Sequence, residues 1–231
     1  MRIVVATHNE GKLFEIRRIM QQDLGDLAQK VELVSAGSLG LPDPVETGAS
    51  FAENALLKAR DVAGRTGLPA LADDSGLIVD VLGAAPGILS ARWSGVHGDD
   101  QANNALLLAQ LADIPDVHRT ARFRCAAALA VPEALARSNA EVQVEADSVT
   151  YDIAVQYVET GDMPGRIIRS PRGEHGFGYD PLFVPDDQPN RTNEQGEPLT
   201  SAEMVPTEKN AISHRGKAIA ALMPDIERLL G

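Results

Sequence analysis

The sequence is poor in cysteine, in aromatic side chains and in positive charge. Its one cysteine, Cys125, cannot form a disulfide within the chain, which favours a reducing compartment. Aromatic residues make up 4% of the chain, and the formal net charge is -12. Because a surface that follows a nucleic-acid backbone needs a basic footprint, this charge argues against nucleic-acid binding. It is compatible with a small polyanionic ligand whose site is locally basic or carries a metal.

Long hydrophobic runs are also missing. No apolar stretch approaches about 18 residues, the length needed to cross a membrane, and the N-terminal strand lacks the long apolar region of a signal peptide. We therefore expect a cytoplasmic protein that does not bind membranes. The 44% hydrophobic and 23% charged content is typical of globular proteins, and 231 residues fit one large domain or one domain of two lobes.

Apolar spacing and turn residues predict alternating strands and helices. The predicted strands lie at 2–6, 31–34, 68–72, 77–82, 122–131 and 179–184, with a hairpin or pair of strands over 142–158. The predicted helices cover 11–22, 50–64, 99–112 and 207–230. This order favours an α/β fold with a mixed sheet and flanking helices. No linker is long enough to separate independent domains, so we expect a single domain, 1–231.

The first strand runs into a polar turn, Thr7-His8-Asn9-Glu10-Gly11-Lys12. Asn9 is suited to cap the helix that follows, and Lys12 falls in its first turn. A helix start offers unpaired N–H groups and a positive dipole end, which together make an anion site. A lysine there is disfavoured unless an anion neutralises it, so the turn predicts a bound phosphate. The pattern is common, however, and fits a kinase or a phosphosugar enzyme equally well.

Acidic residues offer a second candidate site. Asp73-Asp74-Ser75-Gly76 lies between two predicted strands, where Asp and Gly are ordinary β-turn residues. The functional interpretation is a Mg²⁺ ligand together with a water-activating base, because carboxylates perform both tasks. Glu46, in a loop rich in proline and glycine, is either a second oxygen ligand or a solvated loop residue.

Three further groups each allow a structural and a functional interpretation. Lys58 shares a helix face with Asn54, either as the solvated side of the helix or to reach a phosphate. The segment Gly176-Phe177-Gly178-Tyr179 is either a hairpin turn or a platform on which Phe177 stacks against a planar base. Lys209, His214 and Arg215 near the start of the last helix are either solvated or donors to a ligand.

Two common kinds of enzyme site are disfavoured. One cysteine and scattered histidines do not provide the ligand spacing of a zinc site. A serine hydrolase of the nucleophile-elbow type is equally disfavoured, because the chain has no Gly-x-Ser-x-Gly sequence.

Considered together, the motifs and their order are specific. In chain order they are Thr7-x-Asn9-x-x-Lys12, Glu46-Thr47-Gly48, Phe51-x-Glu53-Asn54-Ala55, Lys58-Ala59, Ala72-Asp73-Asp74-Ser75-Gly76-Leu77, Gly83-x-x-Pro86-Gly87, Ser90-Ala91-Arg92, Gly176-Phe177-Gly178-Tyr179-Asp180-Pro181 and Lys209-x-x-x-Ser213-His214-Arg215. The chain thereby resembles the inosine/xanthosine triphosphate pyrophosphatase family of nucleotide house-cleaning enzymes. The resemblance extends from Ile3 to Ala218, nearly the whole chain.

The resemblance implies an elongated mixed sheet with helices, two lobes around a central cleft, a homodimer, and Mg²⁺-dependent hydrolysis of ITP, dITP and XTP to the monophosphate and pyrophosphate. It implies that Asp74 is the proton acceptor and, with Glu46, a metal ligand. The substrate-binding residues that it implies are Thr7, His8, Asn9, Glu10, Gly11, Lys12, Ser75, Phe177, Gly178, Tyr179, Asp180, Lys209, His214 and Arg215.

These roles suggest a mechanism. We expect Mg²⁺ on Asp74 and Glu46 to neutralise the triphosphate together with Lys12 and Lys58, while a water activated by Asp74 attacks phosphorus. A 6-oxo purine would accept from Arg215, His214 or Lys209. Adenine would instead oppose these donors with its amino group and leave buried groups unpaired. Stacking on Phe177 would serve either base.

Two segments depart from the family pattern, and the residues leave two other functions open. The stretch 133–165 and the loop 186–200 are longer than the family leads us to expect. One alternative is a pyrophosphatase for other modified or pyrimidine nucleotides. The other is a nucleotide-binding regulatory module without hydrolysis. A sensor has no need of a base beside its metal, so Asp74 with Glu46 favours an enzyme.

Overall fold

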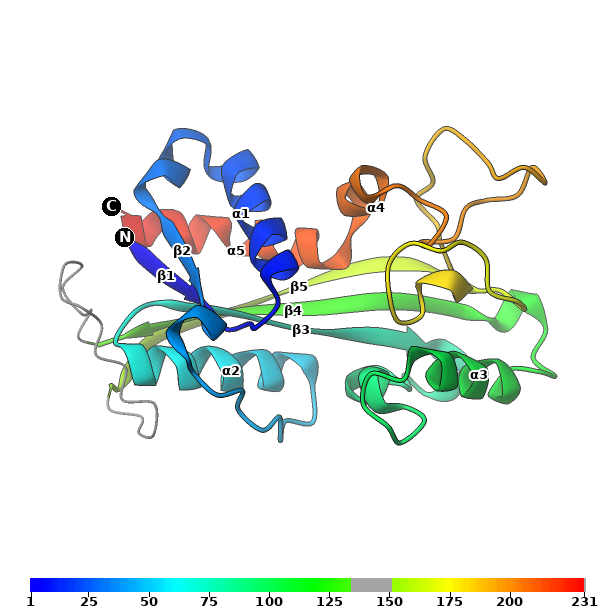
Figure 1. Cartoon of the computed structure of the whole chain (residues 1–231), viewed down its shortest axis with the longest axis horizontal. Helices are drawn as coiled ribbons and strands as arrows, with labels where there is room; N and C mark the ends of the chain where they lie inside the picture. The colour runs from blue at the N-terminus through cyan, green and yellow to red at the C-terminus, as the bar shows by residue number, and fades with distance from the viewer. Residues whose placement is uncertain (134–150, 231) are drawn as a thin grey trace. The chain divides into compact units, whose positions relative to one another are not determined.

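The computed structural model describes residues 1–133 and 151–230 (Figure 1). The strands are β1 (Arg2–Val5), β2 (Glu32–Ser35), β3 (Ala70–Val79), β4 (Thr120–Pro132), β5 (Ile153–Ile167) and β6 (Phe183–Pro185). The helices are α1 (Glu10–Leu24), α2 (Phe51–Thr66), α3 (Asp100–Gln110), α4 (Pro206–Ile212) and α5 (His214–Leu230). The predicted alternation of strands and helices is therefore largely confirmed.

The strands form one six-stranded sheet in the order β2-β1-β3-β4-β5-β6. β1 pairs in parallel with β2 and with β3, whereas β5 and β6 are antiparallel. The sheet is thus mixed, as predicted. Among the described residues no helix is long and apolar enough to cross a membrane.

Contacts along the chain divide it into two compact units. Unit 1 comprises Met1–Asp74, Ala126–Gly161 and Arg215–Gly231, and unit 2 comprises Ser75–Cys125 and Asp162–His214. The chain passes from one unit to the other within β3, between Asp74 and Ser75, and within β4 and β5. The two consecutive predicted site residues Asp74 and Ser75 therefore belong to different units.

Unit 1 is built on helices whose ends and apolar faces follow from the sequence. The Asn9 side chain accepts from the backbone N–H groups of Gly11 and Lys12, at 2.8 and 3.3 Å, and so caps α1 as predicted. The Ser50 hydroxyl accepts from Glu53 N and caps α2. Figure 1 shows α2 along one side of the strands of this unit and α1 with α5 along the other. The buried faces of α1 and α2 consist mainly of Leu13, Ile16, Ile19, Met20 and Leu24, and of Phe51, Ala55, Ala59, Val62 and Ala63.

Unit 2 has a hydrophobic core of its own. The core draws on β3, α3, β4, β5 and the segment around β6, and its buried members are Leu77, Val79, Leu107, Leu111, Ala121, Met163, Ile167, Tyr179, Leu182 and Phe183. Phe123 packs edge-on against Phe183, with ring centroids 4.8 Å apart. This core supports α3 and the glycine-rich segment before β6, which both carry candidate site residues.

The Asp73-Asp74-Ser75-Gly76 sequence is not a turn, and this part of the prediction is wrong. The two short strands predicted around it are one continuous strand, β3, of 10 residues. Turn propensity is overridden because each carboxylate finds cationic or amide partners within the fold. A close approach also favours Gly76, since a Cβ there would lie 2.4 Å from the Ser90 hydroxyl and 2.6 Å from the Gly87 carbonyl oxygen.

Two other predicted elements need correction. The single helix predicted at 207–230 is two helices, because Ser213 adopts an extended backbone between α4 and α5. The strand predicted at 179–184 is short: Asp180–Leu182 forms a 3-10 turn, and only Phe183–Pro185 is strand. Asp-Pro sequences favour turns, and Asp180 accepts from the N–H of Phe177.

The predicted strands over 142–158 are only partly testable. Residues 153–158 belong to β5, whereas 142–150 lie outside the described residues. The long stretch 133–165 is likewise described only in part, because its residues 134–150 lie outside the described ones. The loop 186–200 follows β6 and is described in full.

Candidate active site

The polar turn after β1 is held by its own side chains. Thr7 is buried, and its hydroxyl accepts from the N–H of Asn9 at 3.1 Å. His8 lies 3.4 Å from Asp43, and the Ser35 hydroxyl donates to Glu10 at 2.8 Å. Lys12 extends from the first turn of α1 to Asp73, with 3.5 Å between Nζ and Oδ2. The lysine at the positive helix end is therefore compensated by a carboxylate of β3.

Asp73 forms a buried ion pair with Arg215. Their side chains meet at 3.0 Å, from Nε to Oδ2, and both residues are buried. Arg215 also donates from Nη1 to Glu15 at 3.0 Å. Burial by itself would raise the pKa of Asp73, but the positive charges of Arg215, Lys12 and Lys58 outweigh it and hold that pKa well below its usual range. Asp73 is thus a permanent anion at neutral pH.

Asp74 faces a different set of partners, because successive side chains of a strand point to opposite faces. Asn54 of α2 donates to its Oδ2 at 3.1 Å, and the Lys58 ammonium lies 3.6 Å from its Oδ1. Lys58 also donates to Glu46 at 2.7 Å. We call Glu46, Asn54, Lys58 and Asp74 the carboxylate–lysine cluster. It brings together residues that are well separated in the sequence and all belong to unit 1.

The cluster shifts the pKa values of its members. Burial raises the pKa of Asp74, and Glu46 adds to this effect, while Lys58 opposes it. Burial would lower the pKa of Lys58, but the neighbouring Asp74 and Glu46 carboxylates outweigh burial and raise it. Lys58 therefore remains a cation in the cluster.

The donor chemistry of the cluster fits Mg²⁺. Magnesium takes oxygen ligands and is commonly held by one or two carboxylates, with water and substrate phosphates completing its shell. Glu46 and Asp74 supply two carboxylates beside one lysine. Across residues 1–133 and 151–230, no group of three or more His, Cys, Asp or Glu side chains is placed to hold a metal. A site of the two-carboxylate kind is the one that these residues can form.

Unit 2 places Phe177 and Lys209 together. We call the segment 176–180 the aromatic turn. The Phe177 ring is 68% exposed, and the Lys209 ammonium lies 5.3 Å from its centroid. Lys209 also forms an ion pair with the buried Asp180, at 2.5 Å. An exposed ring beside a cation is suited to stack on a planar base and to donate to its polar edge.

The other predicted residues of this region have structural contacts. The hydroxyl of Tyr179 donates to the carbonyl oxygen of Ser90 at 2.9 Å, and burial raises the pKa of that phenol above its usual range. His214 stacks on Phe123, with ring centroids 5.2 Å apart and planes 16° apart. Ser75 is half-buried in β3.

Sequence reasoning missed several partners of the site. It did not find the pairing of Asp73 and Glu15 with Arg215, nor the bonds of Asp100 and Asn104 of α3 to Gly178. An i, i+4 spacing puts Asp100 and Asn104 on one helix face, but it does not say what that face contacts. In a continuous strand, successive side chains point to opposite faces of the sheet. Had the sequence been interpreted as one strand, Asp73 and Asp74 would have been assigned different roles.

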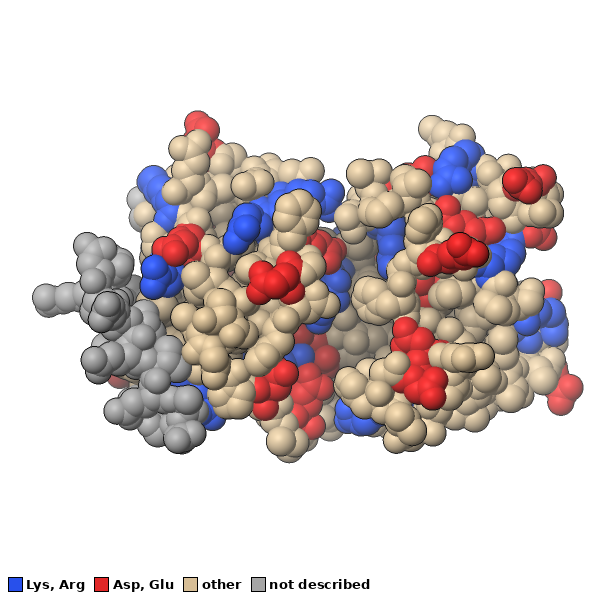
Figure 2. All heavy atoms as spheres, in the orientation of Figure 1, with Lys and Arg blue, Asp and Glu red and all other residues tan. Residues whose placement is uncertain are grey.

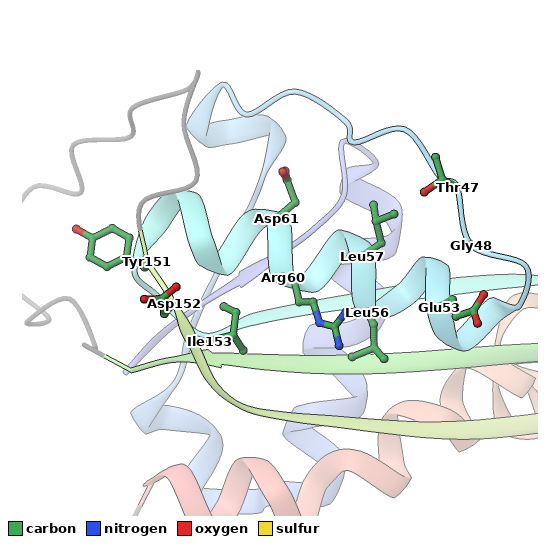
Figure 3. Close-up of a pocket in the computed structure, with 10 residues that line it drawn as sticks. All are labelled: Thr47, Gly48, Glu53, Leu56, Leu57, Arg60, Asp61, Tyr151, Asp152 and Ile153. Atoms are coloured by element: carbon green, nitrogen blue, oxygen red, sulfur yellow. The ribbon is translucent and has the colours of Figure 1, made fainter.

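A cavity of about 720 Å³ opens beside α2, and none of the residues that line it belongs to the carboxylate–lysine cluster. Figure 3 shows its lining: side chains of α2 face the beginning of β5 and the loop before α2. Thr47 and Gly48, beside the predicted ligand Glu46, line it, but none of the residues predicted to bind metal or phosphate does. The lining of this cavity therefore shares no residue with the predicted metal and phosphate site.

Charge on the visible surface is mixed. Figure 2 shows acidic and basic side chains interspersed on the visible face of the described residues, without a broad basic area there. The lack of a broad basic area agrees with the formal net charge of -12. The cationic groups of the candidate site are instead paired individually with carboxylates.

Comparisons with known proteins agree on one family. A family model described as the Ham1 family matches residues 3–225. A protein from Bifidobacterium longum named dITP/XTP pyrophosphatase is 66% identical over 251 residues, covering 100% of both chains. A Mycobacterium abscessus structure titled nucleoside-triphosphatase / dITP/XTP pyrophosphatase is 47% identical, with a TM-score of 0.70 over 97% of this chain and 100% of the other. The Staphylococcus aureus Ham1 protein is 30% identical, with a TM-score of 0.75 over 99% and 100%.

The Asp73–Arg215 pair generates a stability prediction. Asp73→Asn removes one partner of a buried ion pair, so we expect the free energy of unfolding in urea to fall by about 3 kcal/mol. Asp43→Asn is the matched control, because it removes the exposed partner of His8 and is expected to cost less than about 1 kcal/mol. Equal stability of the Asp73 variant and the wild type would show that the pair does not support the fold.

Proposed function

The chain belongs to the Ham1 family and is a nucleoside triphosphate pyrophosphatase, and we propose that it hydrolyses ITP, dITP and XTP to the nucleoside monophosphate and pyrophosphate. Its role would be to remove aberrant purine nucleotides from the precursor pool. The observation that carries the proposal is the carboxylate–lysine cluster, in which Lys58 lies against both Glu46 and Asp74. A metal-dependent hydrolysis of a polyphosphate needs carboxylates that hold the metal and a cation that binds the phosphates at one place.

We propose Mg²⁺ as the cofactor, with Glu46 and Asp74 as its protein ligands. When bound, the ion would neutralise charge on the triphosphate. Lys58 and Lys12 supply further positive charge in unit 1, and Lys12 lies in the first turn of α1, at the positive end of the helix dipole. Thr7 and Asn9 hold that turn in shape.

Asp74 is the proposed general base. It would accept a proton from the water that attacks phosphorus, and pyrophosphate would leave. Asn54 donates to Oδ2 and so fixes the orientation of the carboxylate. Asp73 takes no part in proton transfer in this scheme, since Arg215 and Lys12 hold it as an anion. The two adjacent aspartates would thus have different tasks.

Base recognition is assigned to unit 2. Phe177 would stack on the purine, and Lys209 would donate to the 6-oxo group that hypoxanthine and xanthine share. Adenine would present its amino group to the same donor, a mismatch that a buried site rejects strongly. His214 and Arg215 were also predicted to read the base. Arg215 directs Nε to Asp73 and Nη1 to Glu15, whereas the Lys209 ammonium lies 5.3 Å from the centroid of the Phe177 ring, so Lys209 is the better supported reader.

The resemblance suggests a homodimer, and the composition of the sequence suggests a cytoplasmic location, and we propose both for this chain. The single buried cysteine, Cys125, is compatible with a reducing compartment. A homodimer would elute at about twice the chain mass of 24.6 kDa in size-exclusion chromatography with light scattering.

The proposed specificity predicts an ordering of substrates. With Mg²⁺ present, kcat/KM for pyrophosphate release from dITP, ITP and XTP is expected to exceed that for ATP by about 100-fold or more, because a donor opposite the adenine amino group is left unpaired. A coupled pyrophosphate assay measures this ratio. Equal turnover of ATP and ITP would exclude the proposed base recognition.

The role of Asp74 predicts separation of turnover from binding. In Asp74→Asn the side chain no longer accepts a proton, so kcat for dITP is expected to fall by about 100-fold or more. The dissociation constant for the nucleotide, measured by equilibrium binding, should change little. Asp61→Asn is the matched control, because Asp61 pairs with Arg65 on α2, outside the cluster, and should leave kcat unchanged. Near-normal turnover of the Asp74 variant would rule it out as the base.

A further inference from the structure

The aromatic turn of unit 2 is held by hydrogen bonds from several directions. Asp180 accepts from the N–H of Phe177 at 2.9 Å, and the Tyr179 hydroxyl donates to the Ser90 carbonyl oxygen at 2.9 Å. Both of these bonds come from residues of the turn itself. Gly178, the residue between Phe177 and Tyr179, is instead held by a helix that lies far from it in the sequence.

That helix is α3, which binds both main-chain groups of Gly178. Asp100 accepts from the Gly178 N–H, with 2.6 Å between nitrogen and Oδ2. Asn104 donates from Nδ2 to the Gly178 carbonyl oxygen at 3.0 Å. Because the two residues are four apart, they lie on the same face of α3 and act on one residue together. The resemblance to the pyrophosphatase family assigned no role to either.

The bonds fix a backbone conformation that would otherwise be one of several. Gly178 has φ of +61°, in the left-handed region that favours glycine, and a Cβ there would meet nothing within 4 Å. Packing around the residue therefore does not select this conformation. A glycine is also the residue with most backbone freedom, so two external hydrogen bonds are an effective restraint.

The helix itself is a rigid support. Asp99 caps its N-terminus by accepting from Ala102 N at 3.0 Å, and Leu107 is fully buried in the core of unit 2. At its other end, Gln110 accepts from the indole N–H of Trp93 at 3.0 Å. The position of Asp100 and Asn104 is thus set by the core rather than by the aromatic turn.

Phe177 needs such support, because with 68% of its surface exposed it is not fixed by packing. We propose that Asp100 and Asn104 are positioning residues that hold Phe177 in place to stack on the purine of the substrate. The inference rests on the proposed function. Their effect is on affinity for the base and not on the hydrolytic step, which is assigned to unit 1.

The test is a double-mutant cycle on steady-state kinetics with dITP. Phe177→Ala is expected to raise KM about 5- to 100-fold through lost stacking. Asn104→Ala should raise KM about three- to tenfold, the effect of losing one hydrogen bond, and leave kcat within about twofold. If Asn104 acts through Phe177, Asn104→Ala has no further effect in the Phe177→Ala background. Independent, multiplying effects on KM would contradict the proposal.

Two further variants separate positioning from folding. Asp100→Asn keeps an acceptor for Gly178 N and is expected to retain a near-normal KM, whereas Asp100→Ala should resemble Asn104→Ala. If Asn104→Ala does not fold, the Asp100 pair carries the same cycle. Gln101→Ala is the matched control, since Gln101 is exposed on the same helix. Emission from Trp93, the only tryptophan, reports whether unit 2 is intact.

The outcomes distinguish this inference from the proposed function. A wild type that releases pyrophosphate from dITP, together with multiplying effects in the cycle, would exclude the positioning role alone. A wild type that hydrolyses none of the purine triphosphates would exclude the proposed function, and the role of Asp100 and Asn104 with it. A fall in the kcat of Asn104→Ala with its KM unchanged would also contradict the inference.

Discussion

The guanidinium of Arg215 lies 3.0 Å from the carboxylate of Asp73 in the buried interior of unit 1, and the rest of the candidate site there depends on this pair. Two adjacent carboxylates in the middle of a buried strand are costly unless each is compensated. Arg215 and Lys12 compensate Asp73, which leaves Asp74 to face Asn54, Lys58 and the Glu46 that Lys58 contacts. Through Glu15, the same arginine also connects α5 with α1.

The candidate site residues of the two units differ in chemistry and suit different parts of a nucleotide. In unit 1, charged side chains from a loop, two helices and a strand meet, so that electrostatics dominates and a metal and phosphates are the natural ligands. In unit 2, an exposed aromatic ring is placed by backbone hydrogen bonds from α3 and flanked by Lys209. The first arrangement suits hydrolysis of a polyphosphate, and the second suits selection of a base.

Local signals in the sequence are sufficient for the first three predicted helices and for most strands. The Asn9 cap of α1 and the extent of α2 follow from capping residues and apolar spacing, which act over a few residues. The errors came from long-range partners. Asp73-Asp74-Ser75-Gly76 has the composition of a turn, and partners distant in the sequence, such as Arg215, 142 residues away, explain why it is strand. The break between α4 and α5 at the extended Ser213 likewise has no proline or glycine at that position to predict it. Glu46, Lys58 and Asp74 are candidates from their residue types and places in the sequence, and the resemblance adds roles for Glu46 and Asp74, but that the three lie together follows only from the fold.

The most direct measurement is the identity of the products formed from dITP by the wild-type protein with Mg²⁺, followed by phosphorus NMR. The account predicts one pyrophosphate for each deoxyinosine monophosphate, with no orthophosphate and no nucleoside diphosphate. Orthophosphate appearing together with the nucleoside diphosphate would show that the terminal phosphate is removed instead, and would contradict the central claim.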